Sequence, residues 1–269
     1  MTIKFNKDLY EMKRSKTNSG ILGYVEKLVR SHPLPYFFIR YLIRYTNIFE
    51  EDARGVSFLN LGKNVNIMDI GASDGIAAKF FCNNLNVKNI ICYEPNISYV
   101  KILRKLNIKG LIVKPYAIGN TNTFKKIFFP RSKFFNKNLD LIPYTYYDKE
   151  TLSAQLKLDF KFRKNIQIIE KKLHIKKVEK LKLKIDLIKI DVNDNGLSVI
   201  NGLSKIIKKD KPALLIETDS DILKIDRQLK SYGYGKYIFS NLGNKFIKIK
   251  KKFPLNTYFL QKKHLEKNK

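Results

Sequence analysis

Two aspartates bracket a short glycine-rich turn that follows an apolar run of the chain. In the stretch "NIMDIGASDG", Asp69 lies near the end of the apolar run, and Gly71, Ala72, Asp74 and Gly75 form the turn. Glycine has no side chain and adopts positive φ readily, so such a turn lets the backbone approach a bound molecule closely. The turn matches neither the GxGxxG nor the GxxxxGK[ST] phosphate motif, and no lysine is present in it to reach a phosphate. The pattern predicts a ligand site that does not hold a pyrophosphate.

The carboxylates narrow the chemistry of the expected ligand. They repel a pyrophosphate and attract positive charge. S-adenosylmethionine (SAM) carries an ammonium and a sulfonium and no phosphate, so it meets this requirement. Glu94 follows the turn by roughly 20 residues, the spacing at which an acid accepts hydrogen bonds from both ribose hydroxyls of an adenosine. We therefore predict that Glu94 and the adjacent Pro95 contact the cofactor. Glu94 would serve NAD equally well, and the turn favours SAM.

A simpler interpretation of the same acids stays open. Asp69 would then only cap the end of a strand, and Glu94 would be an exposed acid without a ligand.

These side chains require elements that bring them to one edge of a sheet. Short apolar runs alternate with amphipathic segments, and the runs that we expect to form strands are residues 65–70, 89–94, 111–118, 185–192 and 213–218. Such alternation with short connections predicts an α/β fold with a doubly wound, mostly parallel sheet. Ligands of these sheets bind at the carboxyl ends of the strands, near the point where the strand order reverses. The glycine turn and Glu94 both lie at such ends.

Two stretches interrupt this alternation. Residues 1–62 are expected to form an N-terminal helical extension that acts as a cap or an oligomer contact. Residues 63–269 are expected to form the main domain, with an insertion at about 130–180. That insertion is polar, rich in aromatic residues and longer than an ordinary connection of an α/β fold, so we expect it near the mouth of the site.

The chain resembles a known family over residues 64–218. The stretches "IMDIGASDG", "CYEPN", "YAIGN", "DLIKIDV" and "PALLIET" occur in the order seen in FkbM-type SAM-dependent methyltransferases. The resemblance implies a class I methyltransferase (Rossmann-like) fold, with a seven-stranded sheet that has one antiparallel strand near the C-terminus. Residues 236–252 would supply the last hairpin, with its turn near 242–244. The resemblance also implies SAM as the cofactor and O-methylation, often of a sugar or a natural product.

For methyl transfer, a protein has to hold the acceptor oxygen near the methyl group and remove the proton of the acceptor hydroxyl. We expect Asp191, at the tip of the central strand, to act as this base or to orient the acceptor. The alternative is a strand-end acid that hydrogen-bonds to the cofactor turn. Glu217, at the end of "LLIET", is a second candidate that could instead anchor a loop. We expect Lys189, inside the strand, to pair with an acid.

The segment after Asp191 departs from the family pattern. Family members follow this strand with a pattern like V-E-G-x-E, whereas this chain has "VNDNG", and both glutamates are missing. Asp194 could supply a carboxylate from a shifted position. The turn could equally be a helix entry in which Asp or Asn serves as the cap.

The charge balance raises the question of a polyanionic partner. The chain has 53 Lys and Arg against 24 Asp and Glu, a formal net charge of +29. Such a charge is typical of proteins that bind nucleic acid or anionic membranes. The lysines, however, are spread along the chain and accompany heavy Ile and Asn usage, as a genomic bias towards A+T-rich codons would produce. Nucleic acid is therefore an open partner but not the favoured one.

The remaining residue patterns concern compartment and membrane. Cys82 and Cys92 form no disulfide framework, and the histidines form no metal-binding spacing, so we expect a cytoplasmic protein without a metal site. Residues 33–49 are apolar and aromatic, but Arg40 and Arg44 interrupt them well short of the roughly 20 apolar residues of a membrane span. We predict no transmembrane segment. These residues either pack on the domain or make a peripheral contact in a membrane interface.

The sequence therefore predicts a SAM-dependent methyltransferase that O-methylates a hydroxyl of a small molecule or glycan. A basic surface would help to capture a phosphorylated or acidic acceptor. An RNA methyltransferase and a catalytically degenerate methyltransferase-fold binding protein are the alternatives. A nicotinamide dehydrogenase ranks below both. The oligomeric state is left open.

Overall fold

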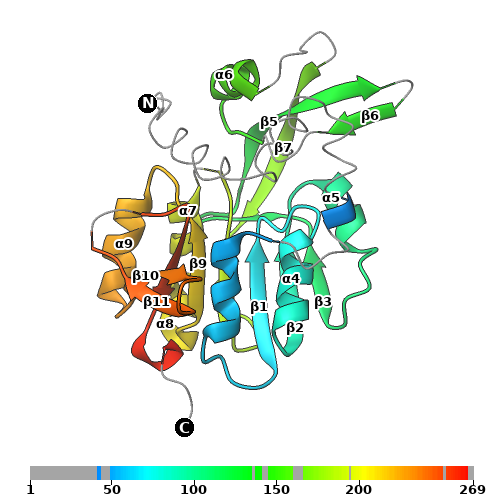
Figure 1. Cartoon of the computed structure of the whole chain (residues 1–269). Coiled ribbons are helices and arrows are strands. Elements are labelled where there is room, and N and C mark those ends of the chain that lie inside the picture. The colour runs from blue at the N-terminus through cyan, green and yellow to red at the C-terminus, as the bar shows by residue number, and fades with distance from the viewer. Residues whose placement is uncertain are drawn as a thin grey trace. The chain divides into compact units, whose positions relative to one another are not determined.

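The computed structural model describes residues 41–43, 49–134, 137–140, 145–159, 166–193, 195–250 and 253–265. The chain divides into two compact units (Figure 1). The larger unit comprises Asn47–Thr123 and His174–Lys269, and the smaller unit comprises Met1–Thr46 and Phe124–Leu173.

The larger unit is built on an eight-stranded sheet in the order β11-β10-β12-β9-β8-β1-β2-β3. Its strands are β1 (Val65–Ile70), β2 (Val87–Tyr93), β3 (Leu111–Lys114), β8 (Leu187–Ile190), β9 (Ala213–Glu217), β10 (Gly235–Ser240), β11 (Lys245–Lys248) and β12 (Asn256–Leu260). The pairs β1·β2, β2·β3, β1·β8 and β8·β9 are parallel, whereas β12 runs antiparallel to both β9 and β10. The strand order reverses between β1 and β8, which places a ligand-binding switch point there. The predicted doubly wound, mostly parallel α/β fold is confirmed.

The sheet has eight strands where the sequence predicted seven. The expected hairpin is present as β10 and β11, and Gly243 and Asn244 in its turn have φ of +83° and +47°. The antiparallel strand that the resemblance implied is β12, which inserts between β9 and β10. The expected segments include β10 and β11, and β12 is the strand that lies outside them. Its five residues are all buried, so its sequence lacks the alternation of apolar and polar residues that marks a half-buried strand.

The expected strand over residues 111–118 is also interrupted. β3 ends at Lys114, and β4 (Ala117–Ile118) pairs instead with the end of β7 (Ile166–Lys176), where Ala117 lies opposite Ile175. Pro115 stands at the break. Because proline has no backbone N–H to donate, it is a poor continuation of a strand inside a sheet.

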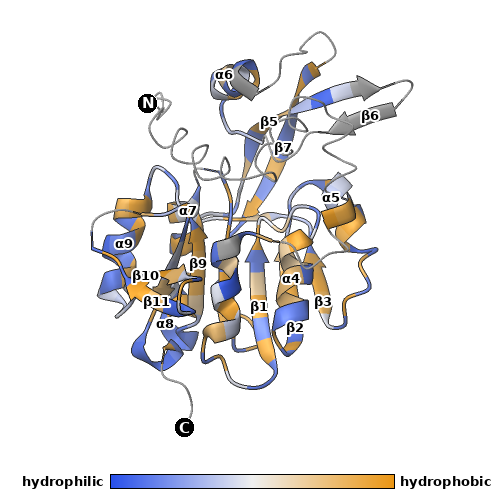
Figure 2. Cartoon of the chain, in the orientation of Figure 1, coloured by the Kyte–Doolittle hydropathy of each residue, from blue (hydrophilic) through white to orange (hydrophobic). Residues whose placement is uncertain are grey.

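Helices cover both faces of the large sheet (Figure 2). They are α4 (Ile76–Asn84), α5 (Ile97–Leu103), α7 (Gly196–Gly202), α8 (Ser204–Asp210), α9 (Ile222–Ser231) and the 3-10 helix η1 (Glu51–Phe58). α7, α8 and α9 pack with Met68 and Ile70, whereas η1 and α4 pack with Val65 and Ile67. Alternate residues of β1 thus enter opposite cores. The helical segment that follows β8 is divided at the buried Leu203 into α7 and α8.

The smaller unit contains the predicted insertion. β5 (Thr123–Phe134) pairs antiparallel with β6 (Lys137–Asp140), and α6 (Lys149–Asp159) follows. Asp148 Oδ2 accepts hydrogen bonds from the N–H and hydroxyl of Thr151 at 2.7 and 2.6 Å, which caps the start of α6. The smaller unit thus includes residues 130–173 of the expected insertion, and the bounds of the insertion stay a prediction. The position of the insertion near the mouth of the site stays a prediction.

Most of the predicted N-terminal extension lies outside the described residues. Residues 41–43 are helical, and η1 begins at Glu51. The segment 33–49, for which a membrane contact was considered, is described only at residues 41–43 and 49. The assignment of residues 1–62 as a separate helical extension stays a prediction.

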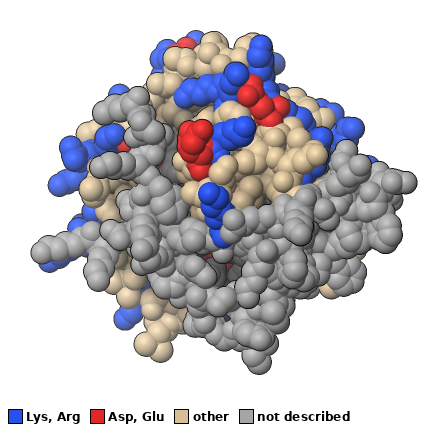
Figure 3. Space-filling model, turned by 90° about the horizontal axis from the view of Figure 1, so that it is seen from above, with Lys and Arg blue, Asp and Glu red and all other residues tan. Residues whose placement is uncertain are grey.

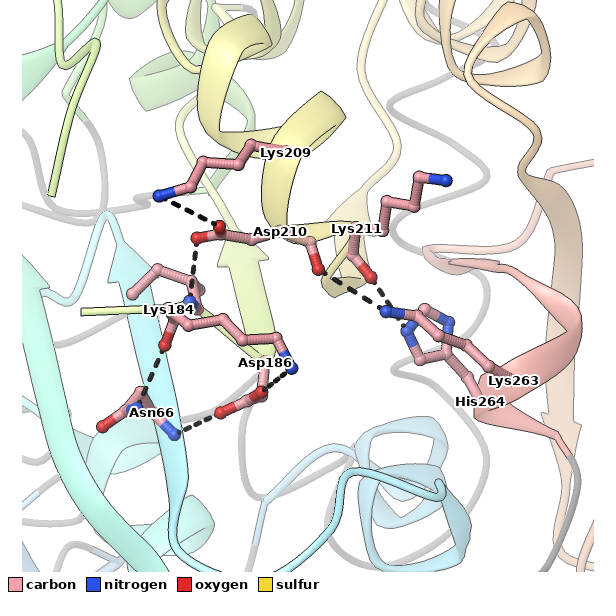
Figure 4. Close-up of polar contacts among 9 residues, drawn as sticks. Asn66, Lys184, Asp186, Lys209, Asp210, Lys211, Lys263 and His264 are labelled. Atoms are coloured by element: carbon pink, nitrogen blue, oxygen red, sulfur yellow. Dashed lines mark hydrogen bonds and ion pairs between the residues drawn. The ribbon is translucent and has the colours of Figure 1, made fainter. Parts of the chain in front are cut away.

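Polar contacts tie the amino edge of the sheet together, at the end of the strands opposite the glycine turn (Figure 4). The N–H of Asn66 donates to Asp186 Oδ2 at 3.0 Å, and Asn66 Nδ2 donates to the carbonyl of Lys184 at 3.0 Å. The N–H of Ile185 donates to Asp210 Oδ2 at 3.0 Å. These bonds fix the entry to β8 against β1 and the end of α8.

A buried histidine fastens the C-terminal segment to the same edge. His264 belongs to the 3-10 helix η3 (Lys262–His264), and the N–H of Gln261 donates to its Nδ1 at 3.0 Å. Nε2 therefore carries the proton and donates to the carbonyl of Lys211 at 3.1 Å. Burial and the charge of Lys263 lower the pKa of His264 to about 4. The imidazole is neutral in the folded protein at neutral pH.

We expect the stability that His264 contributes to be lost on acidification. Between pH 6.5 and about 4 the unfolded chain binds a proton that the folded protein does not, so acid favours unfolding. This proton binding lowers the free energy of unfolding by on the order of 2 kcal/mol between pH 7 and pH 4.5. Urea unfolding of wild type and His264→Gln at both pH values measures it, with His174→Gln as the control. Equal pH dependence in wild type and His264→Gln would refute the assignment.

Candidate active site

The glycine turn is held tightly against the ends of two neighbouring strands. Gly71 has φ of +82°, and its N–H donates to the carbonyl of Tyr93 at 3.0 Å. A Cβ atom on Gly71 would lie 1.9 Å from the carbonyl oxygen of Asp191. Gly75 also has a positive φ, and a Cβ there would lie 2.3 Å from Leu106 Cδ1. Gly71 requires glycine, because its conformation and the adjacent backbone of Asp191 exclude a side chain; at Gly75 the positive φ is what favours glycine.

Glu94 binds the backbone of this turn. The side chain is buried, with Oε2 accepting the N–H of Ser73 at 2.8 Å and Oε1 accepting the N–H of Asn96 at 2.7 Å. Two nearby polar atoms, Ser73 Oγ and Asn96 Nδ2, are buried without a hydrogen-bond partner in the described part of the protein. Buried polar groups are nearly always satisfied, so these two are suited to groups of a bound ligand.

Burial controls the charge of Glu94. The pKa of this carboxyl is raised to about 7, chiefly by burial; the two backbone N–H groups oppose the rise, and the charges of Asp69 and Asp74 contribute to it. A ligand that donates hydrogen bonds to such a carboxylate stabilises its charged form, because these bonds replace the hydrogen bonds to water that burial removes.

An ion-paired cluster lies at the switch point of the sheet. Lys189 Nζ is 3.0 Å from Asp191 Oδ2 and 3.6 Å from Asp69 Oδ1. Burial alone would lower the pKa of Lys189, but the charges of Asp191, Asp69 and Glu50 raise it, so the ammonium is retained. Burial raises the pKa of Asp69, whose oxygens accept no hydrogen bond from the described residues. The expected pairing of Lys189 with an acid is present.

The structure brings together most of the residues that the sequence singled out. Asp69, the turn from Gly71 to Gly75 and Asp191 meet where β1 and β8 end, and the N–H of Asp191 donates to the carbonyl of Ile70 at 3.0 Å. Ala72 and Asp74 are buried in the turn. Pro95 is half-buried beside Glu94.

Asp194 lies outside the described residues, so its proposed role stays a prediction. The helix after "VNDNG" begins at Gly196, and Asn195 makes no side-chain cap to it. The capping acid comes from another loop. Asp219 Oδ2 accepts the N–H of Gly196 at 2.9 Å, and Asp219 Oδ1 accepts the N–H of Asp221 at 3.0 Å.

Sequence analysis missed a second set of acids at this edge. Asn256 Nδ2 donates to Glu50 Oε2 at 2.6 Å and to Asp52 Oδ1 at 3.1 Å. Asn256 lies opposite Glu217 in the pairing of β12 with β9. The sequence carried one signal for this set, because residues 50–52 are three consecutive acids in a chain with a large excess of basic residues.

Basic side chains do not gather into a single patch on the described part of the face seen in Figure 3. Lys and Arg side chains are dispersed there among neutral ones. No helix in the described ranges is long and apolar enough to cross a membrane. The described residues include no group of three or more His, Cys, Asp and Glu side chains that could hold a metal ion.

A doubly wound sheet with a carboxylate-lined glycine turn at its switch point defines a Rossmann-like α/β protein of the class I methyltransferase type. The methyltransferase FkbM domain matches residues 69–235, which is more than half of the chain. The chain therefore belongs to the FkbM methyltransferase family, and the resemblance seen in the sequence is confirmed. This membership identifies SAM as the cofactor of the site.

Comparison with solved structures finds methyltransferases. Methyltransferase FkbM from Methylobacillus flagellatus KT is 12% identical, with a TM-score of 0.45 over 86% of this chain and 60% of that one. Precorrin-6y C5,15-methyltransferase from Geobacter metallireducens GS-15 is 12% identical, with a TM-score of 0.36 over 80% and 89%. The plantazolicin methyltransferase BpumL, in complex with SAH, is 12% identical, with a TM-score of 0.33 over 83% and 66%. The chain thus spans less than two thirds of the first and third of these structures. No curated protein matches it.

Proposed function

We propose that the protein transfers a methyl group from SAM to a hydroxyl of a small molecule or glycan. The observation that carries this proposal is the direct packing of Asp191 against the cofactor turn. The backbone oxygen of Asp191 occupies the space that a side chain on Gly71 would need. Asp191 thus follows β8 directly beside Gly71, and this closeness supports a role for its carboxylate in placing the acceptor oxygen for transfer.

The residues at the sheet edge fit the chemistry of SAM. The carboxylate of Asp69 favours the positive charges of the cofactor, and Glu94 with Ser73 Oγ and Asn96 Nδ2 offers acceptors and donors to its adenosine part. When bound, SAM supplies an electrophilic methyl group on a sulfonium. The protein contributes by binding this donor, orienting the acceptor and removing the acceptor's proton.

Calorimetric titration with SAM and S-adenosylhomocysteine (SAH) tests the cofactor, with NAD as the control. Micromolar binding of the two sulfur nucleosides and no binding of NAD is the expected result. Transfer of a labelled methyl group from SAM to a panel of sugars and hydroxylated small molecules then tests the acceptor class. A folded protein that binds neither sulfur nucleoside would contradict the proposal.

The altered segment after Asp191 supports one competing function. Because "VNDNG" lacks both family glutamates, the protein could bind SAM without transferring its methyl group. SAM binding with no labelled product from any acceptor would favour this degenerate binding protein. An affinity for RNA that falls steeply with salt concentration, together with methyl transfer to RNA, would instead favour an RNA methyltransferase.

Two alanine variants should separate cofactor binding from turnover. Glu94→Ala removes the carboxylate that organises the turn and faces the adenosine site, so we expect SAH binding to weaken by about tenfold or more. Asp191→Ala should lower kcat by about 100-fold and change SAH affinity by less than about threefold. Calorimetry gives the affinities and labelled-methyl transfer gives kcat. Unchanged SAH affinity in Glu94→Ala would refute the placement of the cofactor.

A further inference from the structure

Glu50 is an acid at the active-site edge that no family motif contains. It immediately precedes η1, and Asn256 Nδ2 donates to its Oε2 at 2.6 Å. Asn256 opens β12 opposite Glu217, the last residue of β9. Since β9 pairs with β8 in parallel, this contact holds Glu50 at the same carboxyl edge at which Asp191 follows β8. Its second oxygen, Oε1, is not used by Asn256.

Two members of the ion-paired cluster, Asp191 and Lys189, act electrostatically on Glu50. Desolvation by the surrounding protein, followed by the charges of Asp191 and Asp52, raises the pKa of Glu50 to about 7. The charge of Lys189 and the hydrogen bond from Asn256 act in the opposite direction. The residue nevertheless keeps exposed surface.

Glu50 and Asp191 therefore differ as proton acceptors. Asp191 Oδ2 lies 3.0 Å from the Lys189 ammonium, so this oxygen is already occupied by an ion pair. An acid with a pKa near the working pH is the more effective general base, because it is largely ionised and still binds a proton well. Asp191 is better suited to positioning the acceptor and balancing charge.

We propose that Glu50 is the general base that accepts the proton of the acceptor hydroxyl; this role rests on the methyl transfer proposed above. The acceptor O–H bond breaks and its proton passes to Glu50 Oε1. The acceptor oxygen forms a bond to the methyl carbon as the carbon–sulfur bond breaks, and that bond's electron pair stays on sulfur, which yields SAH. Glu50 then releases the proton to water. Glu50 thus supplies a carboxylate that is missing from "VNDNG".

The isosteric variant Glu50→Gln tests the role in turnover. We expect kcat to fall by about 100-fold or more and the rise of kcat through pH 7 to disappear, because the base is gone. SAH affinity and the thermal midpoint should stay close to wild type. Glu179→Gln is the matched control, since Glu179 is a carboxylate paired with Lys177 and Lys205 at 2.7 and 3.0 Å. It should keep the wild-type kcat and pH profile.

A direct titration keeps the test independent of any acceptor. In protein labelled with ¹³C at glutamate carboxyls, we expect one resonance that is absent from Glu50→Gln and titrates near pH 7 in wild type. The other charged groups that act on Glu50 are Asp52 on η1, Lys189 on β8 and Asp191, which follows β8. Asp191→Asn should therefore shift this midpoint downward.

The outcomes separate the two proposals. Wild type that fails to bind SAH overturns the methyltransferase proposal itself. Normal SAH binding and methyl transfer with an unchanged kcat in Glu50→Gln overturns only the role of Glu50. A Glu50 midpoint near the ordinary value of 4.5 also overturns it.

Discussion

Replacing Gly71 with alanine should abolish SAH binding and destabilise the protein by more than about 3 kcal/mol. The residue has φ of +82°, a conformation that costs an L-amino acid about 1 to 2 kcal/mol. In addition, the new Cβ would lie 1.9 Å from the carbonyl oxygen of Asp191. Backbone must move to relieve this overlap, and it is the backbone that holds the cofactor turn and the end of β8 together.

Gly62 offers a matched control for this experiment. It has φ of +79°, nearly the same as Gly71, but a Cβ at Gly62 meets no atom within 4 Å. Gly62→Ala should therefore lose only the conformational term, about 1 kcal/mol, and keep SAH affinity. Urea unfolding and calorimetry of both variants give the comparison. Similar losses of stability in the two variants would show that the packing of Gly71 on Asp191 is not what requires a glycine.

Replacing Lys189 with methionine should be the other severe change. The substitution keeps much of the side-chain volume but leaves the fully buried Asp69 without its ion-pair partner at 3.6 Å. Removing one member of a buried pair costs about 3 to 5 kcal/mol, since an uncompensated charge stays in a poorly hydrated place. Urea unfolding at pH 7.5 measures the loss. Asp69 becomes neutral when it binds a proton, and the cost of its unpaired charge then disappears. The loss of stability should therefore shrink as pH falls.

Two further variants make the Lys189 experiment specific. Lys184→Met removes a lysine that is largely exposed and lies 3.5 Å from Asp186, so it should cost less than about 1 kcal/mol. The double variant Asp69→Asn/Lys189→Met removes both charges of the buried pair and should recover part of the stability that Lys189→Met loses. If the double variant is less stable than Lys189→Met, the loss does not come from the unpaired Asp69.

Local patterns in the sequence were sufficient for the central part of the fold. The apolar runs that became β1, β2, β8 and β9 are each buried, and periodicity identified them because both faces of the sheet are covered. The C-terminal part of the sheet was harder. β12 is only five residues long and all five are buried, so it produced no periodic signal, and the count of strands was one too low.

The candidate site also contains residues that sequence patterns single out and residues that only the fold brings together. Asp69, Gly71, Asp74, Gly75 and Glu94 were predictable because strand, turn and acid follow one another at short spacing. A ligand class could be inferred from the charge of these acids alone. No pattern of this kind links Glu50 to Asn256, which are more than 200 residues apart in the chain.

The sequence by itself determined the α/β alternation, the glycine turn, the acids that follow β1 and β2, and through them the methyltransferase family. Each of these features is encoded by neighbouring residues. Only the tertiary structure decided that Lys189 pairs with both Asp69 and Asp191, and that Asn256 binds Glu50 at the same edge of the sheet. The physical reason is that parallel strands from distant parts of the chain end at one edge of the sheet. Their charges therefore interact at distances that sequence spacing does not record.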